Sequence, residues 1–303
     1  MLSLRLMNSP AAILLTSLVV LGISGGCAEY GGGAGVVPDV VVIPADLSSD
    51  AGSGGSGTAV ENGTGGSGET VEPGGVGSFK GKVVLTGNLP SLPLPLIHGK
   101  GAPVKDAASC SKEDVPDESL VVSTDGSNGV ANVFVYLARK PKGVSLPPVP
   151  DAEIVYDQIS CKFVPHCVSV TTGQKISVVN ADGVPHNAHS YPSKQTGING
   201  VVNPNDRVGI ELIYQRAETV PLKVACDFHT WMVGYHLPLD HPFHAVTDEN
   251  GDFEIPGLPA GEYEFVVWHE NVGYVHRKFP VTVKGGDPEI ETVDFPADKL
   301  SLN

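Results

Sequence analysis

The sequence predicts an all-β fold, and three observations support this prediction. The chain has 303 residues, of which 37 are Gly and 25 are Pro, about a fifth of the total and well above average usage. From residue 79 onward, short β-branched runs alternate with Gly, Pro, Asn and Asp, which is typical of strands joined by turns. No long stretch shows helical periodicity. Because 41% of the residues are apolar, the chain can still form a core.

The N-terminal part predicts export. Arg5 and the apolar run 11–23, followed by small residues, are typical of a secretion signal over 1–26. Cys27 comes directly after them and predicts a lipid anchor, as in bacterial lipoproteins; ordinary cleavage nearby is the alternative. Residues 27–78 are rich in Gly and Ser and predict a flexible tether. We therefore expect a protein of the periplasm or cell surface, held at a membrane through Cys27 and without a transmembrane helix.

The expected strands fall into three groups along the rest of the chain. These groups are 79–86 and 130–138; then 153–157, 168–171, 175–180, 208–214, 220–226 and 233–239; and finally 253–255, 262–268 and 279–284. Their lengths and turn spacing predict β-sandwiches or barrels. The segment 87–118 contains Pro93 and Pro95 and is expected to be an irregular loop.

The third group begins with a hairpin pattern. Asp248-Glu249-Asn250-Gly251 lies between two strands and supplies Asn or Gly for a turn with positive φ. Together with the turn 257–263, this run resembles the carboxypeptidase regulatory-like β-sandwich, whose pattern is T-D-x-x-G-x-F followed by L-P-x-G-x-Y. The strands that open that family occur far upstream here, at 81–83 and 133–137. The resemblance implies a structural or adhesion module without catalysis.

We predict that this sandwich is split in the sequence. Its first part would be 79–150 and its second 241–303, with a separate domain, 151–240, inserted between them. Three sequential units, with 79–140 a module of its own, are the alternative. The insertion is favoured because the three or four strands of 241–296 alone would bury a poor core.

The inserted segment contains the sharpest chemical pattern. Cys226, His229 and Met232 follow one another at intervals of three residues, and His186 lies forty residues before the Cys. A thiolate, two imidazoles and a thioether are the ligands of a blue-copper site. Three ligands on one loop and a fourth from a facing strand would place the metal at the end of a β-sandwich.

These residues resemble the cupredoxin family, and C-x2-H-x2-M and P-H-N-x-H are closest to its amicyanin-like members. The resemblance implies a Greek-key sandwich over 151–240 and one copper ion that cycles between Cu(I) and Cu(II). It implies that Asn187 ties the ligand loops together and that His189 lies beside the site without binding the metal. Phe228 and Thr230 stand where the family often has Pro, which would affect the redox potential or the spectral type of the site. The implied copper ligands are His186, Cys226, His229 and Met232.

The resemblance implies a one-electron carrier rather than an enzyme. Its redox partner would be a cytochrome, a dehydrogenase or an oxidase, reached through His229 and an apolar patch at Trp231 and Met232. There are three alternatives. The chain could be a copper-holding or interaction protein without redox turnover, or an accessory domain of a copper enzyme with a type 2 copper site. It could also be a cupredoxin-like fold that binds no metal. The net charge of −15 argues against a nucleic-acid binder and favours a basic partner surface. The first 78 residues contain seven acids and one base, so −9 belongs to the remainder.

Three further cysteines remain, and cysteines of exported proteins tend to form disulfides. Of the three pairings we favour Cys110 with Cys161. The run 161–167, which includes His166 and Cys167, is an alternative second metal site. His236, His241 and His244 are expected to be packed or solvated rather than a secondary metal patch. No Ser lies in a nucleophile elbow, and there is no P-loop or dinucleotide fingerprint.

Overall fold

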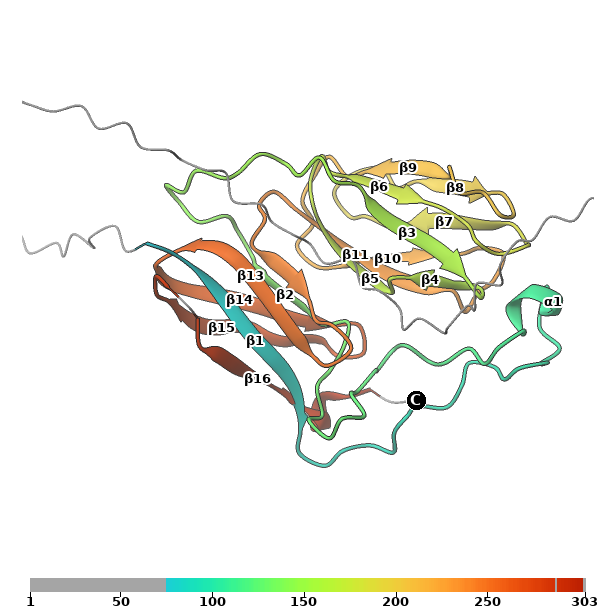
Figure 1. Ribbon diagram of the computed structural model, residues 1–303, viewed down its shortest axis with the longest axis horizontal. Helices are drawn as coiled ribbons and strands as arrows, with labels where there is room; N and C mark the ends of the chain where they lie inside the picture. The colour runs from blue at the N-terminus through green and yellow to red at the C-terminus, as the bar shows by residue number, and fades with distance from the viewer. Residues whose placement is uncertain (1–74, 287, 302–303) are drawn as a thin grey trace, which may run out of the picture. The chain divides into compact units, whose positions relative to one another are not determined.

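In the computed structural model, the described residues are 75–286 and 288–301. The predicted signal over 1–26, Cys27 and most of the predicted tether lie outside them. The described part contains sixteen strands, one short α-helix and one 3-10 helix, which confirms the all-β class (Figure 1). Neither of these helices has the length and hydropathy needed to cross a membrane.

One sandwich is built from both ends of the described chain. Its first sheet has the order β13 (Asp252–Pro259), β1 (Val76–Thr86) and β16 (Ile290–Pro296), with β1 antiparallel to β13 and parallel to β16. Its second sheet has the order β12 (His244–Val246), β2 (Phe134–Leu137), β14 (Gly261–His269) and β15 (Gly273–Val283). Figure 1 shows the early strand β1 between the late strands β13 and β16. We call this the outer sandwich; its predicted boundaries, 79–150 and 241–303, stay predictions.

The outer sandwich has an apolar core. Both of its sheets contribute, for example Val83 of β1, Val135 of β2 and Phe265 of β14, which are all fully buried. The predicted hairpin at 248–251 is instead a turn from β12 to β13, which lie in different sheets. At Gly251 of this turn φ is +81°, and the N–H donates to the Asp248 carbonyl at 3.0 Å. The Gly251 carbonyl in turn accepts from Val83 N at 2.8 Å, so the turn is fixed against β1.

The second sandwich is formed by the chain between these strands, and we call it the inner sandwich. Its larger sheet has the order β5 (Cys167–Thr171), β11 (Val233–Leu239), β10 (Leu222–Ala225), β7 (His186–Ser190) and β8 (Asn199–Val202). The facing sheet has the order β4 (Lys162–Val164), β3 (Ile154–Ile159), β6 (Lys175–Val178) and β9 (Ile210–Ile213). Tyr156, Val178 and Val224 lie in the apolar core between the two sheets.

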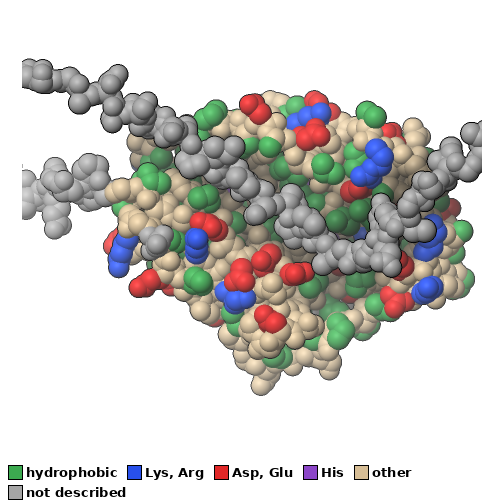
Figure 2. All heavy atoms as spheres, in the orientation of Figure 1, with side chains coloured by type: hydrophobic (Ala, Val, Ile, Leu, Met, Phe, Trp, Pro, Cys, Tyr) green, Lys and Arg blue, Asp and Glu red, His purple; other side chains and the backbone are tan. Residues whose placement is uncertain are grey.

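The two sandwiches share a smaller apolar cluster. Phe134 and Trp268 of the outer sandwich pack there with Leu237 and Cys167 of the inner one. The Tyr136 hydroxyl, also from the outer sandwich, donates to the Thr219 carbonyl at 3.0 Å. Acidic and basic side chains are interspersed on the face shown in Figure 2.

Some elements differ from the sequence-based expectation. The strands β4, β7, β8, β12 and β16 were not expected. The sequence of β7, HNAHS, has no β-branched residue, and its strand conformation follows from pairing with β10 and β8 on its two sides. The segment 87–118 is mostly irregular, as expected, but includes the short helix α1 (Ala107–Cys110).

Candidate metal centre

Strand pairing brings the candidate ligands together at one end of the inner sandwich. β7 and β10 are antiparallel, with His189 opposite Ala225. The beginning of β7, at His186, therefore lies beside the end of β10, which Cys226 follows directly. Residues 226–232 form the loop from β10 to β11, and this loop carries the other two candidates.

Three donor atoms converge in this buried region. His186 Nδ1 and His229 Nδ1 lie 3.0 Å apart, and Cys226 Sγ lies 3.9 Å from each of them. Both imidazoles are fully buried and Cys226 is 2% exposed. Met232 is also buried and packs in the same apolar cluster as Cys226.

The backbone of the ligand loop closes on itself. Met232 N donates to the His229 carbonyl at 2.9 Å, and Cys226 N donates to the Met232 carbonyl at 3.1 Å. These two bonds hold both sulfur residues and His229 in one tight turn. The spacing of three residues in the sequence thus becomes a compact loop across the end of the sheet.

Each imidazole is oriented by a carboxylate. His186 Nε2 lies 2.9 Å from Asp182 Oδ2, and His229 Nε2 lies 2.9 Å from Asp106 Oδ2. Because a carboxylate accepts, Nε2 of each ring donates to it, and Nδ1 is the ring nitrogen that faces the cluster. Carboxylates that fix the tautomer in this way are typical of metal-binding histidines.

Asp182 is itself held firmly. Its two oxygens accept the backbone N–H groups of Ser160 and Cys161, each at 2.8 Å. Burial raises the pKa of Asp182, but the hydrogen bonds from His186 and these amides outweigh burial, so its pKa is lowered. The carboxylate therefore stays ionised and keeps His186 in position.

Asn187 ties the two ligand-bearing segments together. Its Oδ1 accepts from Asp227 N at 2.7 Å, and its Nδ2 donates to the Asp227 carboxylate at 2.9 Å. His189 lies outside the donor cluster: its Nδ1 is 3.2 Å from the Asp227 carboxylate, and its side chain is about one-third exposed.

The cluster changes the acidity of the thiol. Burial raises the pKa of Cys226, but hydrogen bonds from His186 and His229 outweigh burial and lower this pKa to about 6. A thiolate near neutral pH, beside two imidazole nitrogens whose protons a metal ion would replace, suits a cation that prefers sulfur and nitrogen. The residues present therefore fit a copper ion.

A segment from outside the inner sandwich covers this end. Asp106 contacts His229, Lys105 Nζ donates to the Phe228 carbonyl at 3.1 Å, and the His98 ring packs edge-on against Trp231. We call residues 98–111 the cover segment. His229 is fully buried beneath Asp106 of this segment, and the expected electron route from His229 to a partner stays a prediction.

A disulfide fixes the cover segment. Cys110 and Cys161, the pairing favoured from the sequence, are joined, and both are buried. Among the described residues, every group of three His, Cys, Asp or Glu donor atoms within 4.8 Å lies at this end of the inner sandwich. Two of those groups use Cys110 or Cys161, which are already bonded to each other.

The remaining histidines do not converge in this way. His236 Nδ1 accepts from the Tyr214 hydroxyl at 3.0 Å, and His241 Nε2 lies 3.1 Å from the Leu137 carbonyl. Burial lowers the pKa of His236 and His244 to about 3, and the neighbouring His241 lowers that of His244 further. These side chains are packed and neutral, as expected from the sequence.

Sequence reasoning missed Asp106 and Asp182. Asp182 precedes His186 by four residues, a spacing that could have pointed to it. Asp106 is 123 residues from His229, and nothing in the local sequence connects them. That contact depends on the path of the cover segment and on its disulfide.

Comparisons with known proteins give a partial likeness. No family model and no curated protein matches the sequence. A reduced Cu(I) form of an amicyanin mutant at pH 4 is 18% identical with a TM-score of 0.26, over 35% of this chain and 91% of that one. An oxidized amicyanin mutant is 17% identical with a TM-score of 0.26, over 41% and 95%.

A novel purple cupredoxin from Nitrosopumilus maritimus is 25% identical with a TM-score of 0.24, over 29% of this chain and all of that one. Part of the chain thus resembles cupredoxins. At these TM-scores, the function has to be argued from the site itself.

Proposed function

We propose that this chain binds one copper ion through His186, Cys226, His229 and Met232 and carries single electrons outside the cytoplasm. The observation that supports this most is the convergence of two imidazole nitrogens and one thiol sulfur within 3.9 Å in a buried site. A lone buried Cys would be an ordinary core residue. Three donor atoms that face one another in a buried site favour a metal site.

The chemistry of the donor set favours copper. Soft sulfur ligands suit Cu(I), and imidazole suits copper in both oxidation states. When bound, copper would supply a one-electron couple. Zinc also accepts nitrogen and sulfur ligands, so it is the main competitor for the same residues.

The chain's own residues would keep the ligands in place during electron transfer. Asp182 holds His186, Asp106 holds His229, and the closed 226–232 turn holds Cys226. Ligands fixed by surrounding hydrogen bonds and burial need little movement when the charge of the site changes. This favours fast exchange of electrons over catalysis. Electron transfer does not require an opening large enough for a substrate at the donor cluster.

A second candidate is a copper-holding protein without redox turnover. The burial of His229 under the cover segment supports it, because this side of the site is closed to a partner protein. Export, the lipid anchor at Cys27 and a partner with a basic surface remain proposals that rest on the sequence, with a charge of −9 after residue 78.

One experiment separates these candidates. Cu(II) is added to the purified chain, the visible spectrum is recorded, and electron exchange with a small soluble cytochrome is followed by stopped flow. An intense thiolate-to-copper band with rapid exchange supports the electron carrier. The same band with no exchange supports the copper-holding protein. Copper bound without the band, or no bound copper, contradicts the proposed ligand set.

A further inference from the structure

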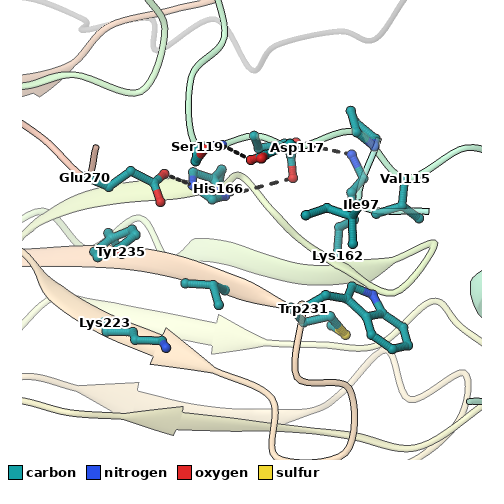
Figure 3. Close-up of a pocket in the computed structure, with 14 residues that line it drawn as sticks. Ile97, Val115, Asp117, Ser119, Lys162, His166, Lys223, Trp231, Tyr235 and Glu270 are labelled. Carbon is teal, nitrogen blue, oxygen red and sulfur yellow. Dashed lines mark hydrogen bonds and ion pairs between the residues drawn. The ribbon is translucent and has the colours of Figure 1, made fainter. Parts of the chain in front are cut away.

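A pocket of about 270 Å³ lies beside the candidate metal centre but uses other polar groups. Several parts of the chain line it, among them residues 115–119, the turn before β5 with His166, and Glu270, which directly follows β14 (Figure 3). Trp231 and Met232 of the ligand loop form part of its wall. The pocket therefore lies where the inner sandwich, the outer sandwich and the long loop before β2 meet.

His166 occupies a specific position in this pocket. It is only 9% exposed, and its Nε2 contacts Glu270 Oε1 in a short hydrogen bond. Since a carboxylate can only accept, Nε2 carries the proton and the neutral ring has its lone pair on Nδ1. This Nδ1 is buried and has no hydrogen-bond partner.

The unpartnered nitrogen faces a second carboxylate. Glu118 Oε2 lies 3.9 Å from His166 Nδ1, too far for a hydrogen bond. The other oxygen of Glu118 contacts Lys162 Nζ at 3.2 Å. A lone pair and a carboxylate oxygen thus face each other across a gap, in the arrangement that a cation between them would stabilise.

We propose that His166 Nδ1 and Glu118 bind a divalent cation of the zinc class, with Glu270 as the positioning residue for the imidazole. Zinc lies about 2.0–2.2 Å from nitrogen and oxygen ligands and is tetrahedral, so two ligand atoms of one ion are about 3.4 Å apart. The observed 3.9 Å between His166 Nδ1 and Glu118 Oε2 is slightly longer, so the Glu118 side chain would move toward the imidazole when the ion binds. Water in the pocket would complete the coordination.

The charges around His166 support a cation there. Glu118 and Glu270 supply two negative charges beside His166, and Lys162, which contacts Glu118, supplies one positive charge. Asp117 and Lys223 also line the pocket, and their charges are opposite. Burial lowers the pKa of His166, but Glu270 and Glu118 outweigh burial, so this pKa is raised. Tyr235 and Cys167 also lie near but are never cations, and burial keeps His269 neutral by lowering its pKa to about 3.

A proton on Nδ1 is the competing way to balance these charges, and it requires no metal. An imidazolium between two glutamates would be a buried ion-pair network. The two possibilities differ in stoichiometry. The metal site adds one bound ion per chain that does not depend on Cys226, whereas the ion-pair network adds none.

The test is a zinc titration of the full chain, with bound metal counted after gel filtration. We expect two zinc ions per chain in the wild type: one dependent on Cys226 and one at His166. Cys226→Ser should retain one zinc, and the X-ray absorption edge of that zinc should show only nitrogen and oxygen ligands. His166→Gln and Glu118→Gln should each weaken the second ion at least tenfold, and Glu270→Gln by about 10–100-fold.

His276→Gln is the matched control, because His276 also lies beside a carboxylate, Asp294, but is partly exposed. It should leave both zinc ions in place. Each His166-region variant must also retain the Cys226-dependent ion, which shows that the inner sandwich has folded. A wild-type chain whose only zinc is lost in Cys226→Ser would overturn the proposal, and so would a second zinc unaffected by His166→Gln. A wild-type chain that binds only the His166-dependent zinc would instead contradict the proposed copper ligands.

Discussion

Cys226 and Cys167 are two buried free thiols with opposite chemistry. Burial raises the pKa of both. At Cys226 the imidazoles of His186 and His229 outweigh burial and lower the pKa to about 6. At Cys167 the carboxylates of Glu270 and Glu118 add to burial, and the pKa rises well above its ordinary value. The cost of burial and the groups that face a thiol together decide whether it can serve as a metal ligand.

The largest expected effect comes from exchanging sulfur for oxygen at these two positions. Cys226→Ser should weaken Cu(II) binding by at least about 100-fold, because the hydroxyl does not ionise near neutral pH and is a poor copper ligand. Cys167→Ser should leave Cu(II) binding within about threefold of the wild type. The affinities are measured by competition with a chelator. Equal losses in both variants would show that the two thiols do not differ as described.

The next effect concerns the carboxylate behind His186. Asp182→Asn should weaken copper binding by about 10–100-fold, because an amide can present its N–H to Nε2 and no longer fixes the tautomer. Asp294→Asn is the control, since Asp294 faces the exposed His276 in the outer sandwich. An Asp182→Asn variant with unchanged copper affinity would mean that His186 is oriented by packing alone.

The packed histidines should respond to pH through stability rather than metal binding. His244 has a pKa of about 3 in the folded chain, so the unfolded chain takes up its proton first as the pH falls below about 6.5. The free energy of unfolding should therefore decrease by about 1–2 kcal/mol for this residue between pH 6.5 and 5. Urea denaturation of metal-free wild type and His244→Gln at both pH values measures it. The His244→Gln variant should lose this part of the pH dependence. An equal decrease in the free energy of unfolding in the wild type and the variant between the two pH values would contradict this prediction.

The smallest effect is expected at Asp106. Its side chain is about one-third exposed, whereas that of Asp182 is one-tenth exposed. Solvent therefore weakens the hold of Asp106 on His229, and Asp106→Ala should weaken copper binding by less than about tenfold. The same competition titration applies. A larger loss than in Asp182→Asn would show that the cover segment, rather than the inner sandwich, organises the site.

Much of the architecture could be predicted from the chain itself. The strand 233–239 was predicted at its observed bounds, whereas the predicted strand 253–255 covers only part of β13 (Asp252–Pro259). The three-residue spacing of Cys226, His229 and Met232 pointed to one loop because such short spacings leave little conformational freedom. The polar strand β7 could not be recognised, since its conformation comes from neighbours on both sides.

The burial of His229 could not be predicted from the sequence for a related reason. Its burial depends on Asp106 and on the Cys110–Cys161 bond, which connects the cover segment to the inner sandwich across 51 residues. The pocket around His166 also depends on tertiary packing, because the segments that line it are far apart in the chain. Sequence patterns report local structure and ligand spacing, whereas these contacts are set by tertiary packing.

The central claim is that one copper ion is held by two imidazoles and the Cys226 thiolate. X-ray absorption of the copper-loaded chain at the copper edge tests this claim most directly. The structure predicts one short copper–sulfur distance and two copper–nitrogen distances in the wild type, with the short sulfur contribution absent in Cys226→Ser and retained in Cys167→Ser. A copper environment of nitrogen and oxygen alone in the wild type would contradict the account.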